Sequence, residues 1–312
     1  MALSISQMIA VSYPEVVNEM RKPANQWAES AFMRELERQG AIERINGSPT
    51  IESTLDYQRN AGAEFQATDL APVSTSKTEV LTAAQFEPAQ LSVPMTWSKK
   101  DEASNPTPNQ KVALVKSLVE NGINSHDDLI EEALFVADTD GFEGLPTLLP
   151  TTGQGTVGGI SAVTEAWWRN YATTYLANFS DIEAKLTVAY NTAAKGSGAS
   201  LTPKFLVSDA DTQAGYEGQL QSLQRFVDAK EADAGFKVLA FKTARYVFSQ
   251  YATSSIYMLN PKSFTLKVFK NAFRLLGDTI ELPNANGYIR KIFSLLQLTT
   301  NNKSRGAVIS AA

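Results

Sequence analysis

The feature that most constrains the fold is a long β-ribbon predicted over residues 49–97. Apolar and polar residues alternate from Ile51 to Gln58, and a centre rich in Gly, Ala, Pro and Ser follows. The predicted return strand carries the apolar residues Val80, Leu91, Val93, Met95 and Trp97. Pro88 and Pro94 favour an edge position for this strand. Because a two-stranded ribbon is barely stable alone, it must fold back on its own domain or lie across a neighbouring copy of the chain.

The residue inventory narrows the chemistry open to the chain. Its 312 residues suffice for one large or two modest domains, and 43% hydrophobic and 20% charged residues are ordinary for a folded protein. The absence of cysteine excludes disulfides, thiolate metal sites and cysteine nucleophiles. The single histidine, His126, excludes metal sites built from several histidines. We therefore expect no catalysis, no cofactor and no metal.

Nothing in the sequence predicts export or membrane insertion. The first basic residue is Arg21, so the N-terminus lacks the positively charged start of a secretion signal. No apolar run is long enough to cross a bilayer. We expect a soluble protein that is made inside the cell and has no membrane partner.

The formal net charge of −5 conceals a basic C-terminal segment. Between residues 262 and 305, only Asp278 and Glu281 oppose the basic residues Lys262, Lys267, Lys270, Arg274, Arg290, Lys291, Lys303 and Arg305. Such a segment either keeps strand ends soluble or faces acidic neighbours or a packaged polyanion.

Helices are predicted at the start of the chain and in its middle. In residues 1–47, Pro23 separates a capped helix from one whose apolar stripe comprises Trp27, Ala31, Phe32 and Leu36, with Gly40 as the stop. Residues 108–137 predict one long helix, whose apolar stripe is Val112, Val115, Val119, Gly122, His126, Leu129, Ala133 and Val136. A break at Gly122 with a restart at Ser125 is the alternative.

Residues 178–258 alternate between helix and strand and predict a compact α/β unit. Helices are expected up to Ala194 and from Ser208 towards Val227. Strands are expected at Phe205–Val207, Phe236–Phe241 and Tyr246–Phe248. After Asn260 the pattern returns to strands, with alternation at Phe264/Leu266/Val268 and Leu296/Leu298/Thr300.

The motifs that could carry chemistry have structural explanations. Gly153, Gly155 and Gly158 match G-x-G-x-x-G, but Pro150 and two threonines stand where dinucleotide binding needs a strand, so a flexible loop is favoured. The carboxylates Asp127, Asp128, Glu131, Glu132, Asp138 and Asp140 predict a solvated helix face, because the calcium-loop pattern is incomplete. His126 predicts a packed structural residue. Trp167 and Trp168 predict one core residue and one subunit contact, although indole rings could also stack on a ligand.

Two stretches resemble the signatures of tailed-bacteriophage major capsid proteins. Residues 144–170, GLPTLLPTTGQGTVGGISAVTEAWWRN, are similar to one, and residues 251–309, with LNP and a closing LTTNNKSRGAVIS, are similar to the other. At the close, the family often has three arginines where this chain has Asn302, Lys303, Ser304 and Arg305, which weakens any inference of a strong electrostatic contact there.

The resemblance implies an α+β fold of the Hong Kong ninety-seven type. Its expected parts are an N-terminal arm (1–48), an extended β-ribbon loop (49–100), a peripheral domain with a long spine helix (101–143), an α/β axial domain (144–258) and return strands of the peripheral domain (259–312). Expected assembly contacts are Trp27, Phe32, Leu36, Ile51, Leu55, Tyr57, Trp97, Trp167, Trp168 and Arg169.

The same resemblance implies a structural subunit, made in the host bacterial cytoplasm, that becomes part of the virion. Copies would form hexamers and pentamers that close into an icosahedral shell around double-stranded DNA. A portal is expected as a partner, together with a separate scaffolding protein or assembly without one, and the presence of a decoration protein stays open. Deletion of residues 58–85 is expected to prevent shell formation. The alternatives are an encapsulin-like compartment shell and, more remotely, a nucleotide-binding α/β enzyme.

Overall fold

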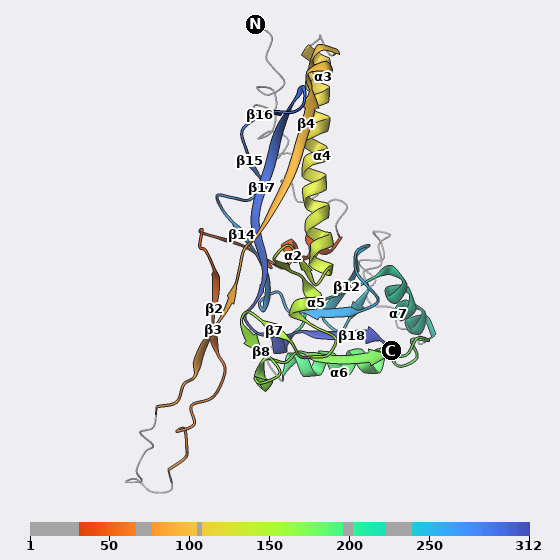
Figure 1. Cartoon of the computed structure of the whole chain (residues 1–312). Coiled ribbons are helices and arrows are strands. Elements are labelled where there is room, and N and C mark those ends of the chain that lie inside the picture. Colours follow the sequence, from red (N-terminus) through yellow and green to blue (C-terminus); the bar gives the residue numbers. More distant parts are fainter. Residues whose placement is uncertain (1–30, 67–76, 105–107, 196–201, 223–238) are drawn as a thin grey trace.

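Two six-stranded β-sheets organise the chain. The computed structural model describes residues 31–66, 77–104, 108–195, 202–222 and 239–312. One sheet, the long sheet, forms a tall column with helix α4 (Pro108–Phe135), and the other, the short sheet, lies at the foot of that column with helices α6 (Ile182–Ala194) and α7 (Ala210–Ser222) (Figure 1). A two-stranded ribbon, β2 (Ile51–Asp56) and β3 (Leu81–Phe86), projects away from both sheets. No helix in the described part of the chain combines the length and apolarity that a membrane span requires.

The long sheet is built around β17 (Gly287–Thr300). Strand β4 (Ala89–Ser98) runs antiparallel along one edge of β17. The other edge is shared by β14 (Phe264–Phe269), β15 (Leu275–Leu276) and β16 (Ile280–Glu281), and β1 (Ile42–Ile45) lies parallel to β14. The edge position predicted from Pro94 is confirmed, but β4 is not the return strand of the ribbon. Leu91, Val93, Met95 and Trp97 pair with β17, and the return strand of the ribbon ends at Phe86.

Helix α4 is continuous through Gly122, as predicted. A Cβ at Gly122 would lie 3.1 Å from both Ile292 Cδ1 and Met95 Sδ, so the glycine lets the helix approach β4 and β17 closely. The predicted stripe drifts off the buried face: Leu129 and Val136 are exposed, whereas Ile123, Ile130 and Leu134 are buried. A stripe with alternating spacings of three and four repeats every seven residues. Seven residues of a straight helix turn through roughly 20° less than two full turns, so the stripe rotates gradually around the helix. Short helix α3 (Lys99–Ser104) precedes α4, and Ser98 and Asp101 form its capping box.

The short sheet has the strand order β11-β12-β10-β13-β18-β9. Its strands are β9 (Tyr171–Tyr175), β10 (Phe205–Ser208), β11 (Ala240–Phe241), β12 (Ala244–Phe248), β13 (Ile256–Leu259) and β18 (Ala307–Ala311). One face packs Leu206, Tyr246 and Met258 against Leu186 of α6 and Tyr216 of α7. The other face packs Phe205 and Val207 into the main core, with Phe32 of α2 (Ala31–Arg38). The α/β unit predicted for residues 178–258 is therefore present where the structure describes it, and the continuation of α7 towards Val227 lies outside the described residues.

The chain first passes from the long sheet to the short sheet between β4 and β9, and its two later crossings, β13 to β14 and β17 to β18, lie side by side. Phe264 pairs with Thr300 in the long sheet, and Met258 pairs with Ala307 in the short sheet. Between them, Asn301 donates its backbone N–H to the carbonyl of Ser263 (3.1 Å). The residues that resemble the capsid signature, 259–263 and 299–306, therefore form the joint between the sheets. The expectation that residues 259–312 all belong to the peripheral part is wrong for β18, which is a strand of the short sheet.

Candidate assembly surface

The base of the ribbon is held by its own chain. Strands β2 and β3 pair in register from Ile51 with Phe86 to Asp56 with Leu81. On one face Ile51, Leu55, Ala84 and Phe86 are buried in the main core, whereas the other face is exposed. The period-two pattern predicted for this strand is confirmed, and it places one apolar face against the body of the molecule.

The ribbon base packs against a glycine-rich hairpin, residues 156–161, which we call the seat. Strands β7 (Thr156–Val157) and β8 (Ile160–Ser161) are joined by Gly158 and Gly159, both with positive φ (+59° and +77°). A Cβ at Gly158 would lie 2.8 Å from Ala84 Cβ, and the carbonyl of Gly158 accepts the Gln85 N–H at 3.0 Å. Only glycine allows this approach. The third glycine of the G-x-G-x-x-G match, Gly158, thus lies in the turn of a β-hairpin, and no helix begins there.

The tryptophan pair extends this seat. Trp167 stacks on Tyr57 with ring centroids 5.0 Å apart, and its indole N–H donates to Glu165 Oε2 at 2.7 Å. Trp168, in the 3-10 turn η1 (Ala166–Trp168), is buried and donates to the carbonyl of Val157 at 3.2 Å. Arg169 donates to the carbonyls of Ala162 and Val163. These side chains fix the segment that carries the hairpin.

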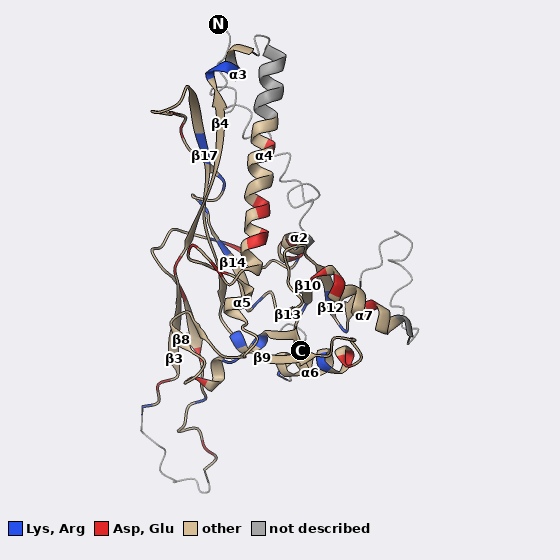
Figure 2. Ribbon diagram, turned by 45° about the vertical axis from the view of Figure 1, so that its right-hand side comes forward, with Lys and Arg blue, Asp and Glu red and all other residues tan. Residues whose placement is uncertain are grey.

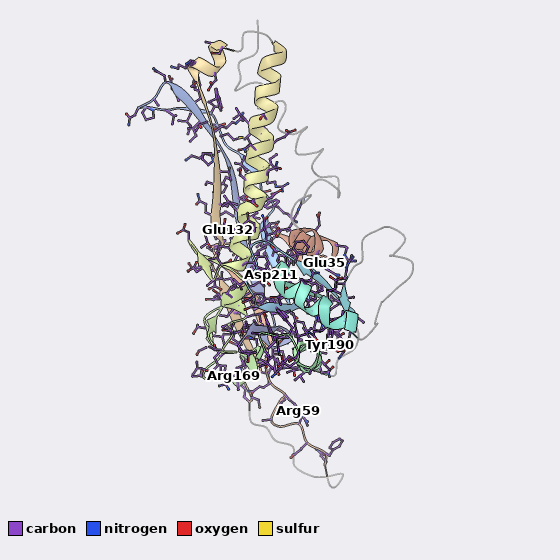
Figure 3. The ribbon with its side chains drawn as sticks, turned by 90° about the vertical axis from the view of Figure 1, so that its right-hand side faces the viewer. Glu35, Arg59, Glu132, Arg169, Tyr190 and Asp211 are labelled. Atoms are coloured by element: carbon purple, nitrogen blue, oxygen red, sulfur yellow. The ribbon has the colours of Figure 1, made fainter. Side chains whose placement is uncertain are left out.

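The distal part of the ribbon, residues 58–66 and 77–80, is held by polar contacts within the described chain. Tyr57 Oη and Gln58 Nε2 both donate to the carbonyl of Glu79, and Thr78 bonds to Asn60 Oδ1. Phe65 is fully exposed (103%), and Leu81, where the paired strands end, is 63% exposed. Figure 3 shows Arg59 on this segment, well below the body of the molecule. The distal ribbon therefore presents apolar area that the described part of its own chain does not cover.

The structure corrects most of the predicted assembly contacts. Trp27 lies outside the described residues. Six of the others are buried inside the chain and offer no apolar area to a neighbour: Phe32, Leu36, Ile51, Leu55, Trp97 and Trp168. Tyr57 and Trp167 are half-buried against each other, and Arg169 is exposed but bonded to backbone carbonyls. The periodic spacing and the apolar character of these side chains predicted that they are buried. The sequence pattern could not show that residues of the same chain, and not of a neighbouring copy, bury them. Phe65 and Gly158 were missed, although two glycines between Val157 and Ile160 are a hairpin pattern.

The acidic positions of α4 are partly buried and structural. His126 is fully buried, with Nδ1 3.0 Å from Asp127 Oδ1 and Nε2 2.8 Å from Ser294 Oγ, and burial lowers its pKa. Asp127 forms an ion pair with Arg274, and Ser249 donates to Glu131, whose pKa burial raises. The packed histidine is confirmed, whereas the solvated acidic face is wrong for Asp127 and Glu131. Within the described ranges, no group of three potential metal-ligating side chains comes together.

The predicted basic face of residues 262–305 does not form as one surface. Arg274 is buried against Asp127, and Arg290 donates to the carbonyl of Gly277. Lys303 is fully buried at the joint between the sheets, and burial lowers its pKa to about 8. No partner for its Nζ occurs in the portion of the chain that is described.

Comparison with known proteins supports this architecture. No protein-family model and no curated protein matches the chain. Among solved structures, a chain of the cyanophage A-1(L) capsid asymmetric unit superposes with a TM-score of 0.65 over 88% of this chain and 92% of its own length, at 15% identity. The chain has the phage major capsid fold. A chain from Mycobacterium phage Bobi (TM-score 0.56, 10% identity, 88% and 89% covered) and the capsid of a native GTA particle (0.55, 10%, 89% and 90%) agree. At such low identity the similarity concerns the fold alone.

Proposed function

We propose that this chain is the major capsid subunit of a tailed phage, a structural protein without catalytic activity. Copies assemble as hexamers and pentamers into an icosahedral shell that encloses double-stranded DNA. The observation that carries this proposal is the distal ribbon, which extends beyond the body of the molecule and exposes Phe65, with Leu81 exposed at the adjoining end of the base. A lone subunit gains nothing from such an extension, whereas a neighbouring copy can cover it.

The division of the ribbon supports a specific assembly role. The seat formed by Gly158 and Trp167 sets the direction in which the ribbon leaves the body. Burying a side chain such as Phe65 on a neighbour contributes about 1.5–3 kcal/mol, and every subunit makes the contact once as donor and once as acceptor. Many modest contacts then give a strong shell through multivalency.

The proposed partners follow from this role. The chain contacts itself within and between capsomers, and a scaffolding protein, a portal and a decoration protein complete the particle. The DNA is held through contacts that do not depend on sequence. Synthesis takes place in the host bacterial cytoplasm.

The test shortens the ribbon without disturbing its seat. Because β3 begins at Leu81, deletion of residues 58–85 would also remove the seated strand. The sharper variant replaces residues 59–78 with a short glycine-rich turn and keeps β2 and β3. We expect this variant to fold, by circular dichroism and thermal unfolding, and to remain a monomer or small oligomer in negative-stain microscopy and analytical ultracentrifugation.

A matched control distinguishes ribbon length from ribbon chemistry. A chain in which Thr78 and Gln58 are exchanged for alanine keeps the full ribbon and should still form shells. Shells of normal size from the shortened variant would refute the proposed role of the distal ribbon. A failure of the unaltered chain to form shells under any condition would refute the capsid function itself.

A further inference from the structure

Charged residues of the short sheet are sorted by strand end. Strands β10 and β12 run parallel, and the backbone N–H of Arg245, near the start of β12, donates to the carbonyl of Lys204, just before β10, at 2.9 Å. Tyr190, near the end of α6, bonds to Thr243 at 2.7 Å. The amino ends of these strands and the C-terminal end of α6 therefore lie at one edge of the sheet.

Six basic residues lie at this edge, among them Lys262, which follows the end of β13 where Leu259 pairs with Phe205. Lys242 Nζ lies 3.0 Å from Asn191 Oδ1 and 4.6 Å from the centroid of the Tyr190 ring, which is labelled in Figure 3. The 3-10 turn η2 (Lys303–Arg305) closes on the same helix end, because Arg305 donates to the carbonyl of Ala194 and Lys195 to Ser304 Oγ. We call this surface the basic edge; it comprises Lys195, Lys204, Lys242, Arg245, Lys262 and Arg305.

Three acidic residues of the same unit, Asp181, Asp209 and Asp211, lie at the opposite edge. Strand β10 ends at Ser208 and is followed by Asp209, and Asp211 lies in the first turn of α7. Asp181 precedes α6 and accepts the backbone N–H of Leu176 at 2.9 Å. The 13 residues of α6 separate the two edges by about 20 Å. In Figure 2, red segments mark α7, whereas blue segments lie beside β9.

Four of the six cations of the basic edge carry charge that no carboxylate of the described chain pairs with: Lys204, Lys242, Arg245 and Lys262. Burial lowers the pKa of Lys195, and nearby Arg305 lowers it further. The partial negative charge at the end of α6 favours Lys195 and Arg305. It does not account for Lys204, Arg245 and Lys262, which lie on strands and turns.

We propose that the basic edge binds the phosphate backbone of nucleic acid. The inference rests on the proposed capsid function, in which the shell encloses DNA. Both residue types at this edge bind phosphate, lysine as a compact point charge and arginine through its planar fork. Because the chain carries a net charge of −5, it repels DNA elsewhere and needs one locally positive surface.

The experiment compares two triple variants with the same change in net charge. Lys204→Gln/Lys242→Gln/Lys262→Gln alters the basic edge. Lys100→Gln/Lys185→Gln/Lys270→Gln is the control, and its Lys185 lies on α6 near the acidic edge. Binding of the full-length subunit to a short random-sequence DNA duplex is measured by fluorescence anisotropy over a salt series, and thermal unfolding verifies that both variants fold.

Each lost phosphate contact weakens binding roughly eightfold at 0.1 M salt and lowers the slope of log K against log salt by about 0.9. We therefore expect the basic-edge variant to bind at least about tenfold more weakly than the control, with a shallower salt dependence. Equal affinity of the two variants would overturn the proposal. Loss of shell formation with unchanged DNA affinity would also overturn it, because the basic edge would then bind a second copy. If the unaltered chain forms no shells but its DNA affinity still depends on the basic edge, the proposed capsid function is refuted. The proposed DNA-binding site is then retained.

Discussion

The base and the distal part of the ribbon belong to the same pair of chain segments but are held in opposite ways. The base buries Ile51, Leu55, Ala84 and Phe86 in the core of its own chain. The distal part is joined by polar contacts within the described residues and leaves Phe65 fully exposed. The difference separates two tasks. The base sets the direction of the ribbon within one subunit, and the distal part supplies area for another.

Substitution of Gly158 should have the largest effect, because it attacks the base. In Gly158→Val, the new Cβ meets Ala84 at 2.8 Å and the β-branched residue is held at a φ of +59°. Strain and overpacking together should lower the free energy of unfolding by about 2–5 kcal/mol, measured by urea denaturation of dilute subunit. In the control, Gly159→Ala, the new methyl group has nothing within 4 Å, so only the positive φ costs about 1–2 kcal/mol. Equal losses in the two variants would mean that the hairpin is not a seat.

Lys303 provides a perturbation remote from the ribbon. Burial lowers its folded-state pKa to about 8 from an ordinary value of 10.5. Between these values the unfolded chain holds a proton that the folded chain lacks, so stability rises with pH across this window. Lys303→Met should therefore be more stable than the unaltered chain by up to about 3 kcal/mol at pH 7, and the gain should vanish above pH 10.5.

The gain from Lys303→Met should be the same in the full-length chain and in the chain with the shortened ribbon, as measured by thermal unfolding from pH 7 to pH 10.5. A gain that depends on ribbon length would show that the distal part is coupled to the joint between the sheets. A gain that does not change with pH would contradict the assigned cause.

Trp167 tests the aromatic part of the seat. Trp167→Ala removes the stack on Tyr57 and the half-buried indole, so it should cost about 1–3 kcal/mol of folding stability. Trp167→Phe keeps a ring in the stack but loses the bond to Glu165, and it should recover most of the stability. Urea denaturation at low subunit concentration makes the comparison. If Trp167→Phe is as unstable as Trp167→Ala, the stability comes from the hydrogen bond between Trp167 and Glu165 and not from the ring stack.

Phe65 should give the smallest change in folding stability. Because its ring has no cover within the described chain, Phe65→Ala should alter the free energy of unfolding of dilute subunit by less than about 0.5 kcal/mol. It should nevertheless raise the critical concentration for shell formation, measured by light scattering. An unchanged critical concentration would show that this ring takes no part in contacts between copies.

Local features of the fold were predictable from the sequence. The continuity of α4 followed from the regular apolar spacing on both sides of Gly122, and the edge position of β4 followed from Pro94. The strand at Phe264 and the helix ending at Ala194 followed in the same way. In each case the signal is local: a periodic apolar spacing, or a residue with restricted backbone geometry, determines the structure of the single helix or strand that contains it.

Features that depend on distant pairing were not predictable. The sequence pattern places β4 in the ribbon, but its partner is β17, nearly 200 residues away. The register partners Ile42 of β1 and Leu266 of β14 are even further apart in sequence, and β18 pairs with the distant strand β9. The seat requires Gly158 to meet Ala84, which no periodicity encodes. Burial of Phe32 and Trp97 by the same chain likewise depends on tertiary packing. Six of the side chains predicted as assembly contacts are therefore buried within the subunit instead.

Hydrogen exchange of the subunit before and after shell formation distinguishes the two parts of the ribbon. Backbone amides of residues 51–56 and 81–86 should be protected in the dilute subunit and in the shell alike. Amides of residues 58–66 and 77–80 should exchange rapidly in the dilute subunit and become protected only in the shell. Equal protection of the distal amides in both states would contradict the conclusion that a second copy covers this part of the ribbon.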